Sequence, residues 1–202
     1  MSIRNLKNKD PRKLVLASSS VYRKALLHRL GVTFDSISSD VDESPLPGEP
    51  LADTALRLAK AKAQAVEKLF PKALIIGSDQ TAVLNGQPID KPGSRDIAIK
   101  QLQQCRGRTI MAYTAICLLN TETGARQLRN ISTQIRFRNF TDEEIEHYLD
   151  IEKPYDCAGG VKTEGLGIVL LAEIQSNDPT AIVGLPLIAL TDMLKAENFC
   201  LL

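Results

Sequence analysis

Short apolar runs alternate with longer amphipathic stretches along the chain, and this pattern predicts strands separated by helices. Residues 14–17 and 73–76 are continuous apolar runs bounded by polar residues, as in buried strands. Apolar residues recur at helical spacing over residues 21–30 and again over residues 51–69, after which Pro71 ends the pattern. The first half of the chain therefore predicts two strand–helix units.

The second half adds hairpin signals to this alternation. Residues 109–119 and 131–138 are β-rich and are joined through the segment TETG, which predicts a hairpin, and Asn85-Gly86 is typical of a tight turn. Further elements are expected as a helix over 95–104, a helix starting at Thr141, a strand over 166–171, and a short strand leading into a last helix within 178–190. Crossovers together with hairpins favour an α/β fold with a mixed sheet.

Composition and charge narrow the class of protein. A chain of 202 residues fits one domain, or two lobes around a cleft. A net charge of +1 lacks the basic excess of general nucleic-acid or membrane-surface binders, so neither partner is expected. No apolar run approaches the roughly 18–20 residues that span a bilayer. The polar N-terminus lacks the apolar region of a signal peptide, so we expect a cytoplasmic protein.

Cysteine and histidine offer little for catalysis or for a structural metal. The four cysteines, Cys105, Cys117, Cys157 and Cys200, are far apart and show no CxxC spacing, so we expect them to be reduced and structural. The chain has only two histidines, and both fall in predicted helices, so we expect neither a histidine metal site nor a Ser–His–Asp triad. Carboxylates, lysines and arginines must therefore perform any chemistry.

A run of serines, Ser18 to Ser20, separates the first predicted strand from the first predicted helix. The first turn of that helix contains Arg23 and Lys24, although the positive end of the helix dipole disfavours cations there. Hydroxyls, cations and the free N–H groups of a helix start together favour a phosphate-binding site. An N-capped surface helix with solvated cations explains the same local pattern about equally well.

Two acidic positions are candidates for an active site. Asp79 follows the second apolar run, so we expect its carboxylate to project from the end of a strand into a cleft. A turn aspartate that bonds its own backbone is the alternative. Glu43 lies in an acidic loop with Asp40 and Asp42, where a hard cation such as Mg²⁺, or simply water, would screen the charges.

The remaining candidates are weak when taken one at a time. Lys62 and Lys91 are more often solvated than functional, and Gln80 is either a substrate contact or a strand-edge amide. Glu164 can read a base edge or cap a turn, whereas Tyr22 can stack on an aromatic ligand or simply pack in the core. Phosphate-loop, dinucleotide-binding and zinc-protease motifs are all missing from the sequence.

Taken in order, several segments resemble the Maf family of nucleoside-triphosphate pyrophosphatases. The resemblance covers roughly residues 13–195 and rests on LASSSVYRKALLHRLG, DVDESP, RLAKAKA, IIGSDQ, DKP, CAGGVKTEGLGI and VGLPL. It implies an elongated α/β fold similar to that of inosine triphosphatases, with a curved mixed sheet flanked by helices and two lobes around a central cleft. It also implies one domain over residues 1–202 with an ordered core near 13–195, usually as a homodimer.

The resemblance also implies a reaction, the hydrolysis of a nucleoside triphosphate between its α and β phosphates. Asp79 matches the family's proposed proton acceptor, and Glu43 together with Asp79 would hold Mg²⁺ or Mn²⁺. The other positions that match the family's phosphate- and metal-handling residues are Ser18, Arg23, Lys62 and Lys91.

Three further positions sort the family's branches, and here they are Tyr22, Gln80 and Glu164. The thymidine- and uridine-triphosphate branch has Arg, Thr and Gln there, whereas an aromatic residue, Gln and Glu resemble the branch acting on 7-methyl-GTP. The chain departs from the family's S-P-x-R loop in having Val21 in place of proline, and it has Tyr22 where this branch more often has Trp. There are two alternatives: a broader pyrophosphatase acting on dTTP, UTP or other non-standard nucleotides, and a nucleotide-binding regulator of septum formation with little catalysis.

Overall fold

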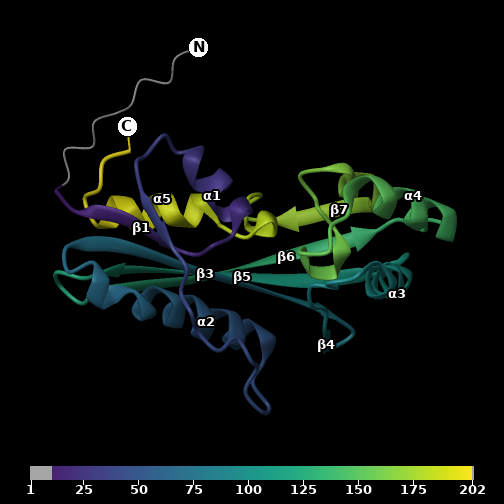
Figure 1. The fold of residues 1–202 in the computed structure, drawn as a ribbon, viewed down its shortest axis with the longest axis horizontal. Helices are drawn as coiled ribbons and strands as arrows, with labels where there is room; N and C mark the ends of the chain where they lie inside the picture. The colour runs from purple at the N-terminus through teal and green to yellow at the C-terminus, as the bar shows by residue number, and fades with distance from the viewer. Residues whose placement is uncertain (1–10, 202) are drawn as a thin grey trace.

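A computed structural model describes residues 11–201 as an elongated α/β protein built on one mixed sheet (Figure 1). Residues 1–10, on which much of the expectation about a signal peptide depends, lie outside the described range. The sheet has seven strands in the order β2-β1-β3-β5-β6-β7, and β4 pairs with β3 beside this path. β1 is parallel to β2 and β3, whereas the other pairs are antiparallel. The predicted mixed sheet is confirmed.

The strands are β1 (Lys13–Ala17), β2 (Asp35–Ile37), β3 (Ala73–Leu84), β4 (Gln87–Pro88), β5 (Thr109–Asn120), β6 (Arg126–Phe137) and β7 (Leu171–Ser176). The α-helices are α1 (Val21–His28), α2 (Leu51–Ala65), α3 (Arg95–Cys105), α4 (Asp142–Glu152) and α5 (Leu187–Ala196). Short 3₁₀ turns are η1 (Glu67–Leu69), η2 (Ala158–Gly160), η3 (Leu166–Leu170) and η4 (Ala181–Val183). No described helix has both the length and the apolar character needed to cross a membrane.

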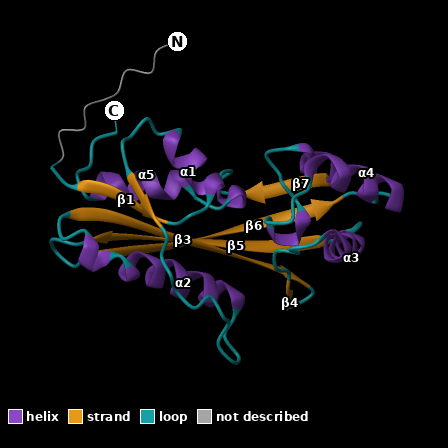
Figure 2. Ribbon diagram, in the orientation of Figure 1, coloured by secondary structure: helices purple, strands orange, loops and turns teal. Residues whose placement is uncertain are grey.

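The helices gather at the two ends of the sheet, with α1, α2 and α5 at one end and α3 and α4 at the other (Figure 2). At the first end, small residues of α2 pack on one face of β1, β3 and β5, and α1 and α5 cover the opposite face. A separate core at the other end joins α3 and α4 to the far halves of the long strands. β3, β5 and β6 run through both ends, so the predicted two lobes share one sheet.

Several expected elements are confirmed and several are wrong in extent. The β5–β6 hairpin, the helix at 95–105 and the capping box at Thr141 form as expected. The helix predicted over 51–69 ends at Ala65 and continues as η1. The strand predicted over 166–171 is instead a 3₁₀ turn, because exposed Ile168 and Val169 have no strand partner, and the strand starts at Leu171.

The largest correction concerns the strand that precedes Asp79. We expected a strand that ends near Ile76 and a separate extended stretch over 81–84, whereas β3 runs unbroken to Leu84 because every residue from Leu74 to Val83 pairs with β5. On its other edge, β3 pairs with β1 only up to Ile76 and with β4 only from Val83. Between those two positions no described strand pairs with this edge, and the gap opens the sheet in the middle of β3.

Candidate active site

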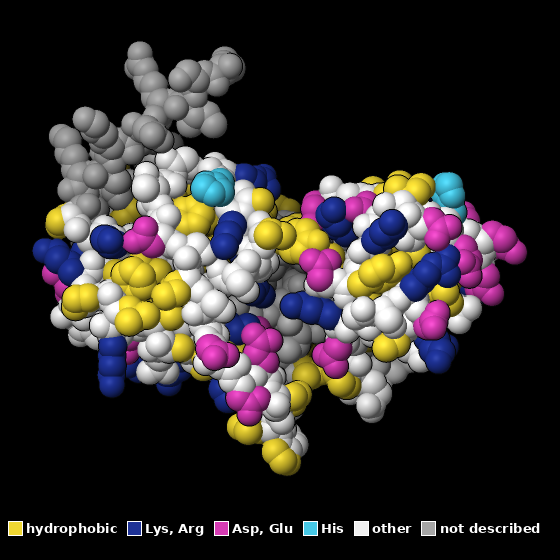
Figure 3. Space-filling model, in the orientation of Figure 1, with side chains coloured by type: hydrophobic (Ala, Val, Ile, Leu, Met, Phe, Trp, Pro, Cys, Tyr) yellow, Lys and Arg dark blue, Asp and Glu magenta, His cyan; other side chains and the backbone are white. Residues whose placement is uncertain are grey.

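A cavity of about 650 Å³ lies at this gap, between the two groups of helices. The space-filling view shows a hollow between the two ends of the molecule, with basic and acidic side chains around it (Figure 3). Residues from the serine loop, α1, the acidic loop, α2, β3 and the loop after α4 line the cavity. All nine residues predicted from the sequence are among them: Ser18, Tyr22, Arg23, Glu43, Lys62, Asp79, Gln80, Lys91 and Glu164.

Alternation along β3 sends its polar side chains to opposite faces of the sheet. Asp79 and Thr81 point toward α2, where Thr81 Oγ1 donates to the backbone carbonyl of Leu51 at 2.9 Å. Ser78 and Gln80 point toward η4 on the other face. Asp79 therefore lies in the middle of a strand and not at the strand end that we predicted, and the gap in pairing on the β1 side exposes this part of β3 to the cavity.

A buried lysine joins the two candidate carboxylates. Lys62 of α2 places Nζ 2.6 Å from an Asp79 oxygen and 2.5 Å from a Glu43 oxygen. The side chains of Lys62 and Asp79 are only 6% and 9% exposed, whereas Glu43 on its loop is 59% exposed. The ion pair therefore combines two nearly buried charges with one carboxylate that solvent or a ligand can reach.

Burial and neighbouring charge act in opposite directions on these acids. Burial raises the pKa of Asp79 above its ordinary value, and the charge and hydrogen bond of Lys62 only partly offset that rise. Burial also tends to raise the pKa of Glu43, but the hydrogen bond and charge of Lys62, with Lys91 and Arg23, outweigh it and lower the pKa overall. Asp79 is therefore the stronger base of the two.

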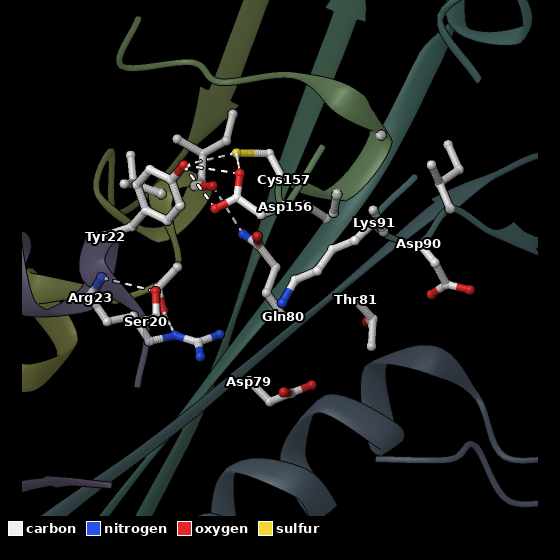
Figure 4. A pocket seen from close by; sticks show the side chains of 18 of the residues that line it. Ser20, Tyr22, Arg23, Asp79, Gln80, Thr81, Asp90, Lys91, Asp156 and Cys157 are labelled. Atoms are coloured by element: carbon white, nitrogen blue, oxygen red, sulfur yellow. Dashed lines mark hydrogen bonds between the residues drawn. The ribbon is translucent and has the colours of Figure 1, made fainter. Parts of the chain in front are cut away.

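The serine loop and the start of α1 hold a half-buried arginine, Arg23, at the cavity. The Ser20 side chain caps α1 by accepting from the Arg23 backbone N–H. The Arg23 guanidinium donates to the carbonyl of Gly184 at 2.8 Å and to the Ser18 hydroxyl at 3.4 Å. Burial lowers its pKa, and the charges of Asp79 and Glu43 oppose this shift. Arg23, Asp79 and the end of the Lys91 side chain point toward one open space (Figure 4).

Gln80 has a fixed amide orientation. Its Nε2 donates toward the carbonyls of Ala181 and Ile182, at 3.0 and 3.1 Å, and lies 2.9 Å from the Thr114 hydroxyl. Carbonyl oxygens accept only, so the NH₂ group must face η4. The amide oxygen has no partner among the described residues and is not one of the unpaired buried atoms, so it is a free acceptor at the cavity.

The end of the cavity near α1 contains two residues that we did not predict as site residues. Asp156 and Cys157 lie on the loop after α4, and the Tyr22 hydroxyl is 3.2 Å from both carboxylate oxygens of Asp156 (Figure 4). Cys157 Sγ lies 3.6 Å from the same hydroxyl, and its pKa is raised to about 11 by burial and by the charges of Asp156 and Glu164. Neither residue has a spacing signal in the sequence, because only the fold brings this loop to α1.

Glu43 and Asp79 can hold a divalent cation only if a substrate supplies further ligands. Both Glu43 and Asp79 place an oxygen within 2.6 Å of the same nitrogen, so the two carboxylates face one position. The described residues offer no group of three metal-binding side chains. Mg²⁺ commonly takes one or two carboxylates and completes its shell with phosphate oxygens and water.

Comparison with known proteins agrees with this geometry. The family model described as Maf-like protein matches residues 13–197. The chain belongs to the Maf family. Among Maf relatives, a protein of Cupriavidus metallidurans named 7-methyl-GTP pyrophosphatase is 53% identical over 186 residues, which cover 92% of this chain and 94% of the relative. One of Aromatoleum aromaticum with the same name is 52% identical over 189 residues, covering 94% and 97%.

A solved structure, that of the Staphylococcus aureus Ham1 protein, aligns with a TM-score of 0.45 at 18% identity, covering 62% of this chain and 72% of that one. A likeness at this level carries no argument about function.

Proposed function

We propose that this Maf protein hydrolyses the α–β phosphate bond of 7-methyl-GTP and releases 7-methyl-GMP and pyrophosphate. The observation that supports this most is that one cavity joins a cationic end to an aromatic and acidic end. A triphosphate tail suits the first end, and a methylated guanine, which is positively charged, suits the second. The relatives named 7-methyl-GTP pyrophosphatase, at 52–53% identity over most of the chain, support the same substrate.

The triphosphate is held by the cations that line the cavity. Arg23 and Lys91 contact the phosphates, and the Ser18 hydroxyl and Lys62 complete the cradle. Because Arg23 is fixed by the Gly184 carbonyl before any substrate binds, its charge is already oriented toward the phosphates. Preorganised cations of this kind stabilise the charge that develops on a leaving pyrophosphate.

Asp79 accepts a proton from the attacking water. Its raised pKa makes it a better base than an exposed aspartate, and Lys62 keeps it in place at 2.6 Å. Glu43 and Asp79 are the residues that would hold Mg²⁺ or Mn²⁺. Such an ion, when bound, neutralises charge on the triphosphate. A homodimer remains a prediction from the family resemblance, and a cytoplasmic location remains a prediction from the polar N-terminal sequence.

The base is read by acceptors. Gln80 offers its free amide oxygen and Glu164 its carboxylate, and both line the cavity. Guanine presents two neighbouring donors, N1–H and the exocyclic amine, which match a pair of acceptors. Uracil and thymine present one N–H between two carbonyls, so two acceptors would leave a mismatch against them.

A substrate panel tests the proposal. Purified protein is given 7-methyl-GTP, GTP, dTTP and UTP, and pyrophosphate release is followed with Mg²⁺ and with EDTA. We expect metal-dependent release with 7-methyl-GTP preferred by at least about tenfold in kcat/KM, the scale of one well-made polar contact. Equal rates on all four nucleotides would contradict the substrate assignment, and binding without metal-dependent turnover would favour a regulator.

A further inference from the structure

The aromatic end of the cavity contains an acidic side chain that neither the family resemblance nor the proposed reaction uses. Asp156 is exposed, lines the cavity, and accepts from the Tyr22 hydroxyl with both carboxylate oxygens at 3.2 Å. Glu164 lines the same cavity, and both carboxylates act on the nearby Cys157 thiol. Two negative charges therefore face this end of the cavity.

The neighbouring cations do not neutralise Asp156. Arg23 donates to Gly184 and Ser18, and Lys62 pairs with Glu43 and Asp79. Lys91 acts electrostatically on Glu43, at the phosphate end. The described ion pairs include none to Asp156, whose hydrogen-bond partners are the uncharged Tyr22 and Cys157. Its charge is therefore available to a ligand at the face of the Tyr22 ring.

We infer that Asp156 is a specificity-determining residue that selects a nucleotide with a positively charged base over the neutral base of the same shape. The inference rests on the proposed function and explains why the protein would prefer 7-methyl-GTP to GTP. The Tyr22 ring lines the cavity, and a cation over the face of such a ring is attracted to its π electrons. The Asp156 carboxylate at the rim adds a full negative charge within reach of the same base. An uncharged guanine gains little from either.

The substitution Asp156→Asn separates charge from shape. Asparagine keeps an oxygen that can accept from the Tyr22 hydroxyl, so the ring keeps its position while the charge is lost. Asp156→Glu keeps the negative charge on a longer side chain, and Tyr22→Phe removes the hydroxyl but leaves the Asp156 side chain unchanged. Asp192→Asn is the matched control, because Asp192 is exposed on α5 and does not line the cavity.

The experiment measures binding of 7-methyl-GMP and GMP by calorimetry, and kcat/KM for the two triphosphates, at slightly acid pH where the methylated base stays cationic. We expect Asp156→Asn to lower the preference for the methylated nucleotide by about fivefold, the effect of a single partly exposed charge. Asp156→Glu should retain most of the preference, Tyr22→Phe should keep it within about twofold, and Asp192→Asn should leave it unchanged.

Three outcomes would overturn the inference. These are equal binding of the two monophosphates by the wild-type protein, a loss of affinity for both by the same factor in Asp156→Asn, and a Tyr22→Phe variant that loses the preference as fully as Asp156→Asn does. Failure of the proposed function is a different result. If neither triphosphate is hydrolysed but 7-methyl-GMP is still preferred in an Asp156-dependent way, the inference stands and the reaction does not.

Discussion

At the scale of single residues, the positive charge of Lys62 is shared between two carboxylates. It lies between Glu43 and Asp79, at 2.5 and 2.6 Å, and is itself buried. Its charge and hydrogen bond lower the pKa of both acids, against burial that raises the pKa of both. Lys62 is therefore placed to set the pH at which Asp79 becomes able to accept a proton.

Replacing this lysine predicts a shift in the pH profile. In Lys62→Met the raised pKa of Asp79 should rise further, because burial then acts without the opposing cation. Since Asp79 must be ionised to act as a base, the acid limb of kcat/KM should move to higher pH, in addition to a loss of rate. Lys68→Met, on the exposed η1 turn, is the control. An unshifted acid limb would show that Lys62 does not tune Asp79.

At the scale of elements, the site depends on the close contact of α2 with β3. A Cβ added at Gly77 would lie 2.1 Å from the carbonyl oxygen of Ala59 and 2.8 Å from the backbone N of Ala63. Both contacts are with backbone, so no side chain can turn away to make room. The bare backbone at Gly77 allows α2 to approach closely enough for Lys62 to reach Asp79.

We therefore expect Gly77→Ala to destabilise the protein by about 1–3 kcal/mol or more, because the helix must move away from the strand. Urea unfolding measures the loss, and the variant should also lose activity while still folded, since Lys62 and Asp79 are separated. A wild-type midpoint in urea would mean that the two elements are less closely packed than described.

The acidic loop provides a second prediction at this scale. Glu49 accepts from Arg57 Nε at 2.8 Å and from the Thr54 hydroxyl at 2.9 Å, which ties the loop holding Glu43 to α2. These bonds lower its pKa from 4.5 to about 2. A lowered pKa means that the stabilisation is present above pH 4.5 and is lost as the pH falls toward 2.

Glu49→Gln should loosen this loop and raise KM a few-fold, about the effect of removing one ion pair, with a smaller change in kcat. Steady-state kinetics with 7-methyl-GTP would measure it. Glu122→Gln, which removes a surface pair with Lys72, is the control and should change neither constant. A KM equal to that of the wild type would show that the loop does not depend on Glu49.

The elements also show where sequence patterns succeed. Amphipathic spacing and caps predicted α3, the start of α4 and the β5–β6 hairpin, because these depend on local signals. The unbroken course of β3 past Asp79 was missed, since polar residues within a strand read as its end unless the pairing with β5 is known. Asp156 was missed for a related reason, because its partner Tyr22 is 134 positions away in the chain.

At the scale of the whole molecule, three long strands join two groups of helices, and the cavity opens where no described strand pairs with one edge of β3. One end of this cavity collects cations and the Asp79–Lys62–Glu43 ion pair, and the other collects Tyr22, Asp156 and Glu164. A substrate that fills this cavity must therefore be anionic at one end. At its other end it must carry an aromatic group with hydrogen-bond donors or a positive charge.

Identification of the products formed by the wild type and by Asp79→Asn decides whether this cavity cleaves the α–β bond of 7-methyl-GTP with Asp79 as the base. We expect 7-methyl-GMP and pyrophosphate from the wild type, and a turnover lower by about 100-fold or more in the variant, whose circular dichroism should be unchanged. Release of orthophosphate and 7-methyl-GDP, or near-normal turnover by Asp79→Asn, would contradict it.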